Sequence, residues 1–253
     1  MGEKRLMVIS SAEQLLEGKT RRDFLKLVGL GGAVIFLPSV LTSCNNSSSN
    51  IMGPPGSGSP LVIDFAKGDI AVLQFAYALE QLEADFYTRV VANFSSSLSA
   101  TEQAVLGDIK NHEVIHREAL KAVLGTSNGF TVHTTYSGLN FSDRTSVLTT
   151  AKTFEDLGVA AYNGAAQYLT STANLLVAGK IVSVEARHAS AIRDLIAPKT
   201  SSQGDSGTSF APKSFDDVFS PGKVKTAAQA FVVEQITFSN APSTFVQGPN
   251  NNG

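Results

Sequence analysis

Apolar residues recur at intervals of three and four through most of the chain from residue 65 to residue 197, which is the period of amphipathic helices. The pattern falls into four long stretches and predicts helices over residues 69–92, 99–125, 145–170 and 172–197. The second stretch opens on Ser99 with Glu102 three residues later, the spacing of a capping box. Gly125 and Pro198 are the predicted ends of the second and fourth helices.

The lengths of the connections indicate how these helices are arranged. Short links join the first helix to the second and the third to the fourth, so each pair is expected to form an antiparallel hairpin. Residues 125–144 show no helical period and are long enough for the second hairpin to cross over the first. A shorter helical stretch covers residues 223–236. The sequence therefore predicts an all-α fold, a four-helix bundle of two hairpins joined by a long crossover, plus a short C-terminal helix.

Residues 1–43 have the features of an export signal. Arg21 and Arg22 lie in the sequence Thr-Arg-Arg-Asp-Phe-Leu-Lys, which resembles the twin-arginine motif. The apolar stretch over residues 27–41 is interrupted by glycines and is shorter than the roughly 18 residues that cross a bilayer. It leads to Cys44 in a sequence that resembles a lipobox, in which the cysteine receives lipid after cleavage. The alternative interpretation is an amphipathic helix with a chance pair of arginines.

These patterns divide the chain into four parts. We expect a twin-arginine lipoprotein signal peptide (1–43), a lipidated flexible tether (44–64), the helical bundle (65–197), and a C-terminal loop, short helix and disordered tail (198–253). The expected location is the bacterial cell envelope, with the protein lipid-anchored to the membrane on its periplasmic or extracytoplasmic face. Lipidation of Cys44, the only cysteine, would leave no thiol for disulfides, metal ligands or nucleophilic catalysis.

The composition narrows the classes of function. A chain of 253 residues that is 43% hydrophobic and 17% charged, with one cysteine, is neither disordered throughout, nor collagen-like, nor a disulfide scaffold. Its formal net charge of −2 argues against nucleic acid as the main partner.

A carboxylate interrupts the apolar stripe of each long helix. In order along the chain, these carboxylates belong to Glu80, Glu113, Glu155 and Glu185. His116 and His188 follow the second and fourth at a spacing of three, which lets each Glu and His contact one metal ion. Because a buried unpaired carboxylate costs several kcal/mol, four that converge need counter-ions. The pattern predicts two metal ions inside the bundle, iron or manganese; the alternative is a polar-cored bundle that binds nothing.

The two halves of the bundle repeat one another. Six residues separate Glu80 from Tyr87, and six separate Glu155 from Tyr162, so the repeat extends beyond the Glu-x-x-His pairs. It indicates the internal duplication of a helical hairpin. The two tyrosines are candidate catalytic residues that would hydrogen-bond the ligands or a metal-bound oxidant. Alternatively, they are core aromatics with satisfied hydroxyl groups.

Two segments carry a family resemblance, namely FEDLGVAAY over residues 154–162 and VEARH over residues 184–188. They resemble the ferritin-like superfamily, in particular exported ferritin-like proteins of the desiccation-related type, and the resemblance covers residues 65–197. It implies a ferritin-like bundle with a carboxylate-bridged dimetal centre. The implied ligands are the bridging carboxylates Glu113 and Glu185, the terminal carboxylates Glu80 and Glu155, and the nitrogen ligands His116 and His188.

The chain departs from better-known relatives at three positions. Many di-iron members place Asp directly before the glutamate of Glu-x-x-His, as a partner for a ligand histidine, whereas this chain has His112 and Val184 there. Rubrerythrin-like members carry an extra glutamate where this chain has Gly158, and no cysteine-rich electron-transfer module is present. A rubrerythrin-type peroxidase is therefore disfavoured. A closed storage cage is disfavoured too, because a lipid tether and a long tail do not suit it.

Neighbouring residues have two interpretations each. Glu83, three residues after the first ligand, is expected on the helix surface, with a seventh metal ligand as the alternative. His112 is expected beside the ligands or at the surface, with a role as a metal ligand as the alternative. Gly158 and Gly164 either make room beside the centre or allow close contact between helices.

The expected function is metal-mediated oxidation of ferrous iron, or peroxide chemistry, in protection against oxidative or desiccation stress. Dioxygen or peroxide would be the reacting partner, and a homodimer is a further expectation. One alternative is a non-catalytic structural or binding protein of the envelope with a stabilising metal. A second is a manganese-catalase-like peroxide dismutase.

Overall fold

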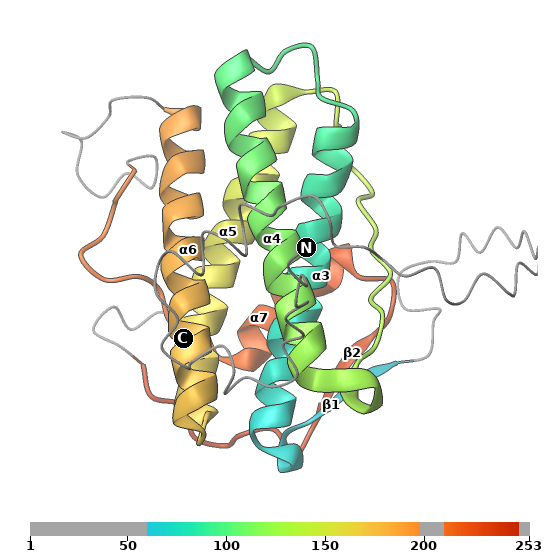
Figure 1. The fold of residues 1–253 in the computed structure, drawn as a ribbon, viewed down its shortest axis with the longest axis vertical. Helices are drawn as coiled ribbons and strands as arrows, with labels where there is room; N and C mark the ends of the chain where they lie inside the picture. Colours follow the sequence, from blue (N-terminus) through green and yellow to red (C-terminus); the bar gives the residue numbers. More distant parts are fainter. Residues whose placement is uncertain (1–59, 198–209, 248–253) are drawn as a thin grey trace, which may run out of the picture. The chain divides into compact units, whose positions relative to one another are not determined.

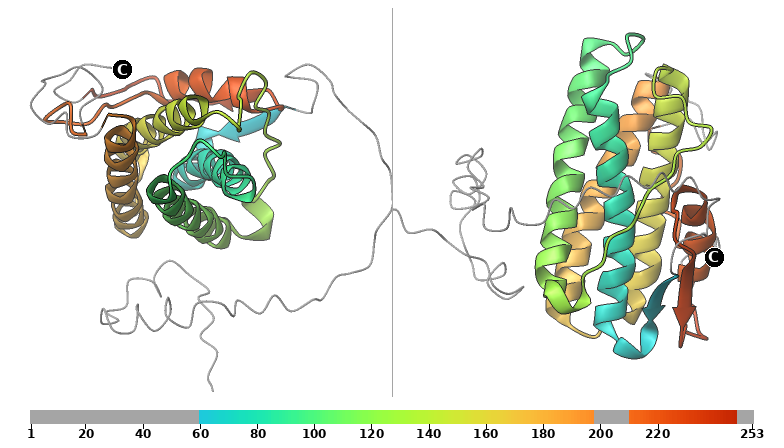
Figure 2. Two further views of the ribbon diagram at one scale, coloured as in Figure 1. Left: turned by 90° about the horizontal axis from the view of Figure 1, so that it is seen from above. Right: turned by 90° about the vertical axis from the view of Figure 1, so that its right-hand side faces the viewer.

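The computed structural model describes residues 60–197 and 210–247, in which four long helices lie side by side (Figure 1). The helices are α3 (Asp69–Ala92), α4 (Ala100–Asn128), α5 (Arg144–Ala165) and α6 (Thr172–Ile196). α3 packs mainly against α4, and α5 packs mainly against α6. The crossover between α4 and α5 follows the length of the bundle (Figure 2), so the two middle helices run in the same direction. The predicted bundle of two hairpins and a long crossover is confirmed.

The expected export signal and lipid site lie outside the described residues, as do Arg21, Arg22 and Cys44. Within residues 60–197 and 210–247, no helix combines the length and the apolar character that crossing a membrane requires.

The predicted helix ends follow from local chemistry. The Ser99 side chain accepts a hydrogen bond from the backbone N–H of Glu102, and the Glu102 carboxylate accepts one from the N–H of Ser99 at 2.7 Å. This is the capping box that the sequence predicts. Gly125 interrupts α4 with φ of 64°, a conformation that glycine adopts without steric cost, and a single turn follows it.

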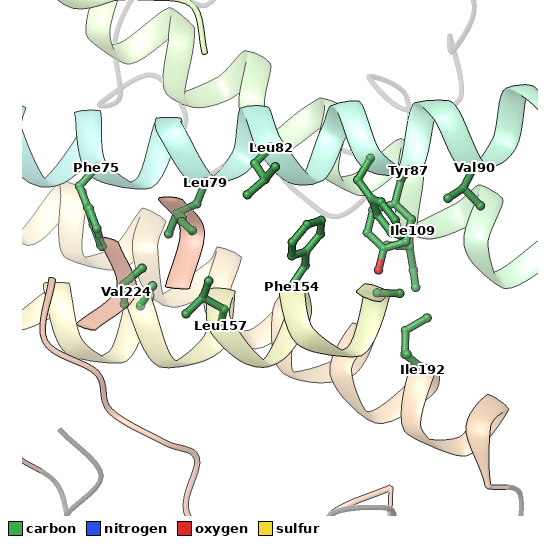
Figure 3. Packing of buried hydrophobic residues seen from close by; sticks show 14 of the residues in the cluster. Phe75, Leu79, Leu82, Tyr87, Val90, Ile109, Phe154, Leu157, Ile192 and Val224 are labelled. Carbon is green, nitrogen blue, oxygen red and sulfur yellow. The ribbon is translucent and has the colours of Figure 1, made fainter. Parts of the chain in front are cut away.

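Aromatic and aliphatic side chains fill the space between the helices (Figure 3). Phe75 and Leu79 of α3 belong to the same buried cluster as Phe154 and Leu157 of α5. Val224 of α7 (Pro221–Ala228) completes this cluster, and α7 packs against α5. The short C-terminal helix is thus part of the core rather than an appendage.

The predicted helix over residues 223–236 is wrong in its extent. α7 begins at Pro221 and ends at Ala228, and a single 3-10 turn, η3 (Gln229–Phe231), follows it. The Gln229 side chain ends the helix because its amide hydrogen-bonds the turn that comes next. It donates to the carbonyl of Glu234 at 2.8 Å and accepts from the N–H of Ile236 at 2.8 Å. The chain then continues as the strand β2 (Ile236–Ser239).

The expected tether and tail are both ordered in part. Residues 61–64, the end of the expected tether, form β1 (Leu61–Asp64), which pairs with β2 as a two-stranded parallel sheet. A 3-10 turn, η1 (Phe65–Lys67), leads from β1 into α3. Beyond β2, the backbone of Thr244 accepts a hydrogen bond from the Tyr168 hydroxyl. Tyr168 ends the 3-10 turn η2 (Ala166–Tyr168), which replaces the last turn predicted for the third helix. Strands of four residues from distant segments carry too short a pattern to be predicted from sequence.

Gly164 lets the backbone before α7 lie directly on α5. A Cβ atom at this position would lie 1.8 Å from the carbonyl oxygen of Phe219. The N–H of Phe219 donates a hydrogen bond to the carbonyl of Ala160, one helical turn earlier on α5. Of the two interpretations of Gly164, the structure therefore supports close contact between segments.

We expect Gly164→Ala to lower the free energy of unfolding by about 1–3 kcal/mol, because a backbone carbonyl cannot move away without losing this contact. Gly179→Ala is the matched control, since nothing lies within 4 Å of a Cβ atom at Gly179 of α6. That control should gain about 0.5–1 kcal/mol from the helix propensity of alanine. Urea unfolding of the metal-free proteins measures both values, and equal shifts in the two variants would contradict the assignment.

Candidate metal centre

The predicted ligands converge in the middle of the bundle, one or two from each long helix. Glu80, Glu113, Glu155 and Glu185 all have a relative exposure of 0%. His116 and His188 are buried as well, although each comes from a helix with an otherwise largely solvent-exposed outer face. Helical spacing places each histidine one turn from the glutamate on its own helix, so that both point into the same interior space.

These residues form two overlapping groups whose ligand atoms all lie within 4.8 Å of one another. The first group contains Glu80, Glu113, His116 and Glu185, and the second contains Glu113, Glu155, Glu185 and His188. Glu113 and Glu185 belong to both groups, and the other residues belong to one each. The arrangement is that of two adjacent cation positions that share two carboxylates.

The hydrogen-bonding state of these side chains fits such cations. Ten buried side-chain nitrogen and oxygen atoms of the described residues lack a hydrogen-bond partner, and eight of the ten belong to the six predicted ligands. They are Glu80 Oε2, both carboxylate oxygens of Glu113, His116 Nδ1, Glu155 Oε2, both carboxylate oxygens of Glu185, and His188 Nδ1. Because buried polar atoms are almost always paired, this concentration of unpaired donors and acceptors indicates a site for metal ions.

Both histidines turn Nδ1 toward the carboxylates. His116 Nδ1 lies 3.0 Å from Glu185 Oε1 and 3.5 Å from Glu80 Oε2. His188 Nδ1 lies 2.9 Å from Glu113 Oε1 and 3.3 Å from Glu155 Oε2. Each histidine thus contacts the shared carboxylate from the opposite hairpin, even though these short contacts lack the angles of good hydrogen bonds.

The carboxylates favour positive charge between them, as the pKa values of the surrounding groups indicate. Burial raises the pKa of Glu80 to about 7, and burial together with neighbouring carboxylates raises that of Glu185 well above its usual value. Burial by itself would lower the pKa of His116, but the surrounding carboxylates hold it at about 12. Burial lowers the pKa of His188 too, and the carboxylates of Glu113 and Glu155 raise it to about 10. Positive charge is therefore favoured in the space between the carboxylates, which the two Nδ1 atoms face.

Tyr87 and Tyr162 join the two hairpins at the centre. The Tyr87 hydroxyl on α3 donates to Glu155 Oε1 on α5 at 2.5 Å, and the Tyr162 hydroxyl on α5 donates to Glu80 Oε1 on α3 at 2.5 Å. Burial and the adjacent carboxylates raise the pKa of both tyrosines well above 10, so each remains a hydrogen-bond donor. The structure thus supports the interpretation in which the tyrosines hydrogen-bond the predicted ligands, here Glu155 and Glu80.

Glu83 is buried, contrary to the expected surface position. Its relative exposure is 3%, and it lies beside Gly158 of α5. A Cβ atom at Gly158 would lie 3.1 Å from Glu83 Oε1 and 3.0 Å from Glu185 Oε2. Gly158 therefore makes room for two carboxylates beside the centre, although Glu83 belongs to neither four-residue group.

His112 extends the cluster to the surface of α4. Its Nδ1 lies 2.8 Å from Nε2 of His188, the ring nitrogen that faces away from the carboxylates. His112 itself is exposed, which agrees with the expectation of a residue beside the ligands or at the surface. The sequence placed His112 beside the ligands but did not identify His188 as its partner.

A family model matches the chain over its helical bundle. Residues 68–198 match the family described as ferritin-like domain, which covers slightly more than half of the chain and all six predicted ligands. No curated protein matches the chain.

We expect Glu83→Gln to stabilise the metal-free protein increasingly as the pH rises. Burial, and then the charges of Glu185 and Glu113, raise the pKa of Glu83 well above 4.5 in the folded state. The unfolded chain releases this proton near pH 4.5 while the folded protein keeps it, so stability falls as pH rises above that value. Glutamine has nearly the same shape and does not titrate.

Urea unfolding from about pH 5 to about pH 8 measures the difference between wild type and variant. Glu118→Gln is the control, because Glu118 is exposed on the outer face of α4. A stability difference for Glu83→Gln that is the same at every pH would contradict the prediction.

Proposed function

The chain belongs to the ferritin-like domain family, and we propose that it binds a carboxylate-bridged pair of metal ions, iron or manganese, and uses them to oxidise ferrous iron or to react with peroxide. The observation that carries the proposal is the set of eight buried ligand atoms without hydrogen-bond partners, gathered into two groups that share two glutamates.

The proposed ligand roles follow the membership of the two groups. Glu113 and Glu185 would hold both ions, because they alone belong to both groups. Glu80 and Glu155 are terminal carboxylates, and His116 and His188 each give one ion an Nδ1 ligand. Hard carboxylate oxygens with one imidazole per ion suit iron and manganese, and the charge of four carboxylates balances two divalent ions.

Two such ions supply, when bound, the exchange of two electrons with dioxygen or peroxide. The chain's own residues provide the setting for that chemistry. Tyr87 and Tyr162 hold the terminal carboxylates in place through their hydroxyl groups. The apolar core on either side of the centre, which includes Phe154 and Leu120, limits the entry of water.

A small oxidant fits the space beside the centre. An apolar cavity of about 20 Å³ borders the ring of Tyr162, whose hydroxyl bonds Glu80. Leu73 and Leu120 are among its other lining residues. A cavity of this size takes about one small molecule, and an apolar lining favours dioxygen over water.

We also propose that the protein is exported and lipid-anchored to the envelope, where it acts against oxidative or desiccation stress. The support is the order of three features in the sequence, namely the arginine pair at Arg21 and Arg22, the apolar stretch and Cys44. Radiolabelled palmitate should enter the wild-type protein in cells but not a Cys44→Ala variant.

We expect about two ions of iron or manganese per purified wild-type chain, because the six ligands form two positions. The double substitution Glu113→Ala/His116→Ala should lose them, since it removes a bridging carboxylate and an imidazole. Glu118→Gln, on the exposed face of the same helix, should retain them. Elemental analysis measures all three proteins, and equal, substoichiometric metal in all of them would refute the dimetal proposal.

Turnover assays on the loaded wild type then separate the functions. Dioxygen consumption with added ferrous iron identifies ferrous oxidation, and oxygen release from peroxide by the manganese-loaded protein identifies a catalase-like dismutase. A protein that loses stability on chelation but shows neither activity would have a purely structural metal centre.

We expect Tyr87→Phe and Tyr162→Phe to weaken metal binding by roughly 10- to 100-fold, because each removes the hydrogen bond that orients a terminal carboxylate. Both variants keep the ring and hence the packing. Tyr168→Phe is the control, because its hydroxyl bonds the backbone of Thr244 outside the centre. Competition with a chelator measures the affinities, and a Tyr168→Phe loss equal to the other two would contradict this role.

A further inference from the structure

The two hairpins differ in the residue that precedes the bridging glutamate. On α4 this residue is His112, and on α6 it is Val184. His112 Nδ1 lies 2.8 Å from His188 Nε2, and the two rings are nearly parallel, with an interplanar angle of 8°. Val184 has only carbon atoms in its side chain, and no residue within 60–197 or 210–247 hydrogen-bonds Nε2 of His116. The two hairpins thus differ in the support that they give to the outer nitrogen of the ligand histidine.

The contact between the two imidazoles allows one arrangement of their protons when His188 binds a cation through Nδ1. His188 turns Nδ1 toward the carboxylates, so a neutral His188 that binds a cation there carries its proton on Nε2. That N–H donates to Nδ1 of His112, whose own proton is then on Nε2 of an exposed ring. His112 therefore acts as an acceptor that holds the ring and the tautomer of His188. His116 has no comparable support from the residues that the structure describes.

We propose that His112 is a positioning residue that makes the two metal positions differ in their affinity for the ion. This inference rests on the proposed dimetal function. The position formed by Glu155 and His188 binds its ion more tightly than the position formed by Glu80 and His116. Hydrogen bonds to the outer nitrogen of a ligand histidine commonly change metal affinity by roughly 10- to 100-fold, which sets the expected difference between the two positions.

Titration of the metal-free protein with Co²⁺ tests this inference, because the visible absorption of Co²⁺ reports on the ligands of each bound ion. Wild type should bind two ions in two steps whose dissociation constants differ by roughly 10- to 100-fold. His112→Val places on α4 the residue that α6 has at the equivalent position. The dissociation constant of the first step should therefore rise toward that of the second, and the absorption band of the first ion should change. Val184→His copies the α4 side and should tighten the second step.

His112→Asn is the conservative variant, since the amide oxygen of asparagine can occupy the place of Nδ1 and accept from His188. It should restore two separate steps, which a merely structural role for the ring would not explain. The exposed position of His112 makes loss of folding a minor concern, and circular dichroism of each variant checks it.

The outcomes separate the inference from the function on which it rests. Two bound ions in wild type with an unchanged titration in His112→Val would overturn the role of His112 and leave the dimetal centre standing. A wild type that binds no more Co²⁺ than Glu113→Ala/His116→Ala would refute the dimetal centre itself, and the role of His112 with it.

Discussion

Repulsion among carboxylates in an interior without water is the constraint around which this bundle is built. Four glutamates with no exposed surface converge on one space, and a fifth, Glu83, lies beside them. Such a group of anions can persist in the folded state only with cations or protons between its members. Without a metal ion, the raised pKa values of Glu80, His116 and His188 favour protons in that role. The same places suit metal ions, because a divalent ion supplies the charge without the proton.

Because no hairpin contains a complete set of ligands, the centre also depends on how the two hairpins meet. Each predicted metal position takes residues from both hairpins, and the two tyrosine hydroxyls cross between α3 and α5 in opposite directions. The ligand groups are therefore complete only when the two hairpins are packed against each other. The segment after residue 210 secures this packing from outside, since Phe219 and α7 lie against α5.

Helical spacing and duplication were enough to predict the bundle and to name the six residues that converge. Burial of Glu83 was not predictable in this way, because its room comes from Gly158 on a different helix. The duplication nevertheless held a signal, since Glu83 and Gly158 occupy equivalent positions, three residues after Glu80 and Glu155. When one hairpin has a large side chain and the other has glycine at the equivalent position, the large side chain can fill the space beside the glycine. The strands β1 and β2 had no such signal, because each is four residues long and their pairing joins the two ends of the domain.

Two of the positions at which the hairpins differ lie next to the centre, and they act in different ways. The pair Glu83 and Gly158 adds a buried carboxyl group on the side of Glu185, while the pair His112 and Val184 adds a hydrogen bond on the side of His188. An apolar residue of similar size in place of Glu83, whose pKa is raised by burial and by the charges of Glu185 and Glu113, would remove the cost of burying this carboxyl group and stabilise the metal-free bundle. The fold therefore gives up stability directly beside its predicted ligands, which is the pattern expected where a site for ions, rather than packing, determines the residue.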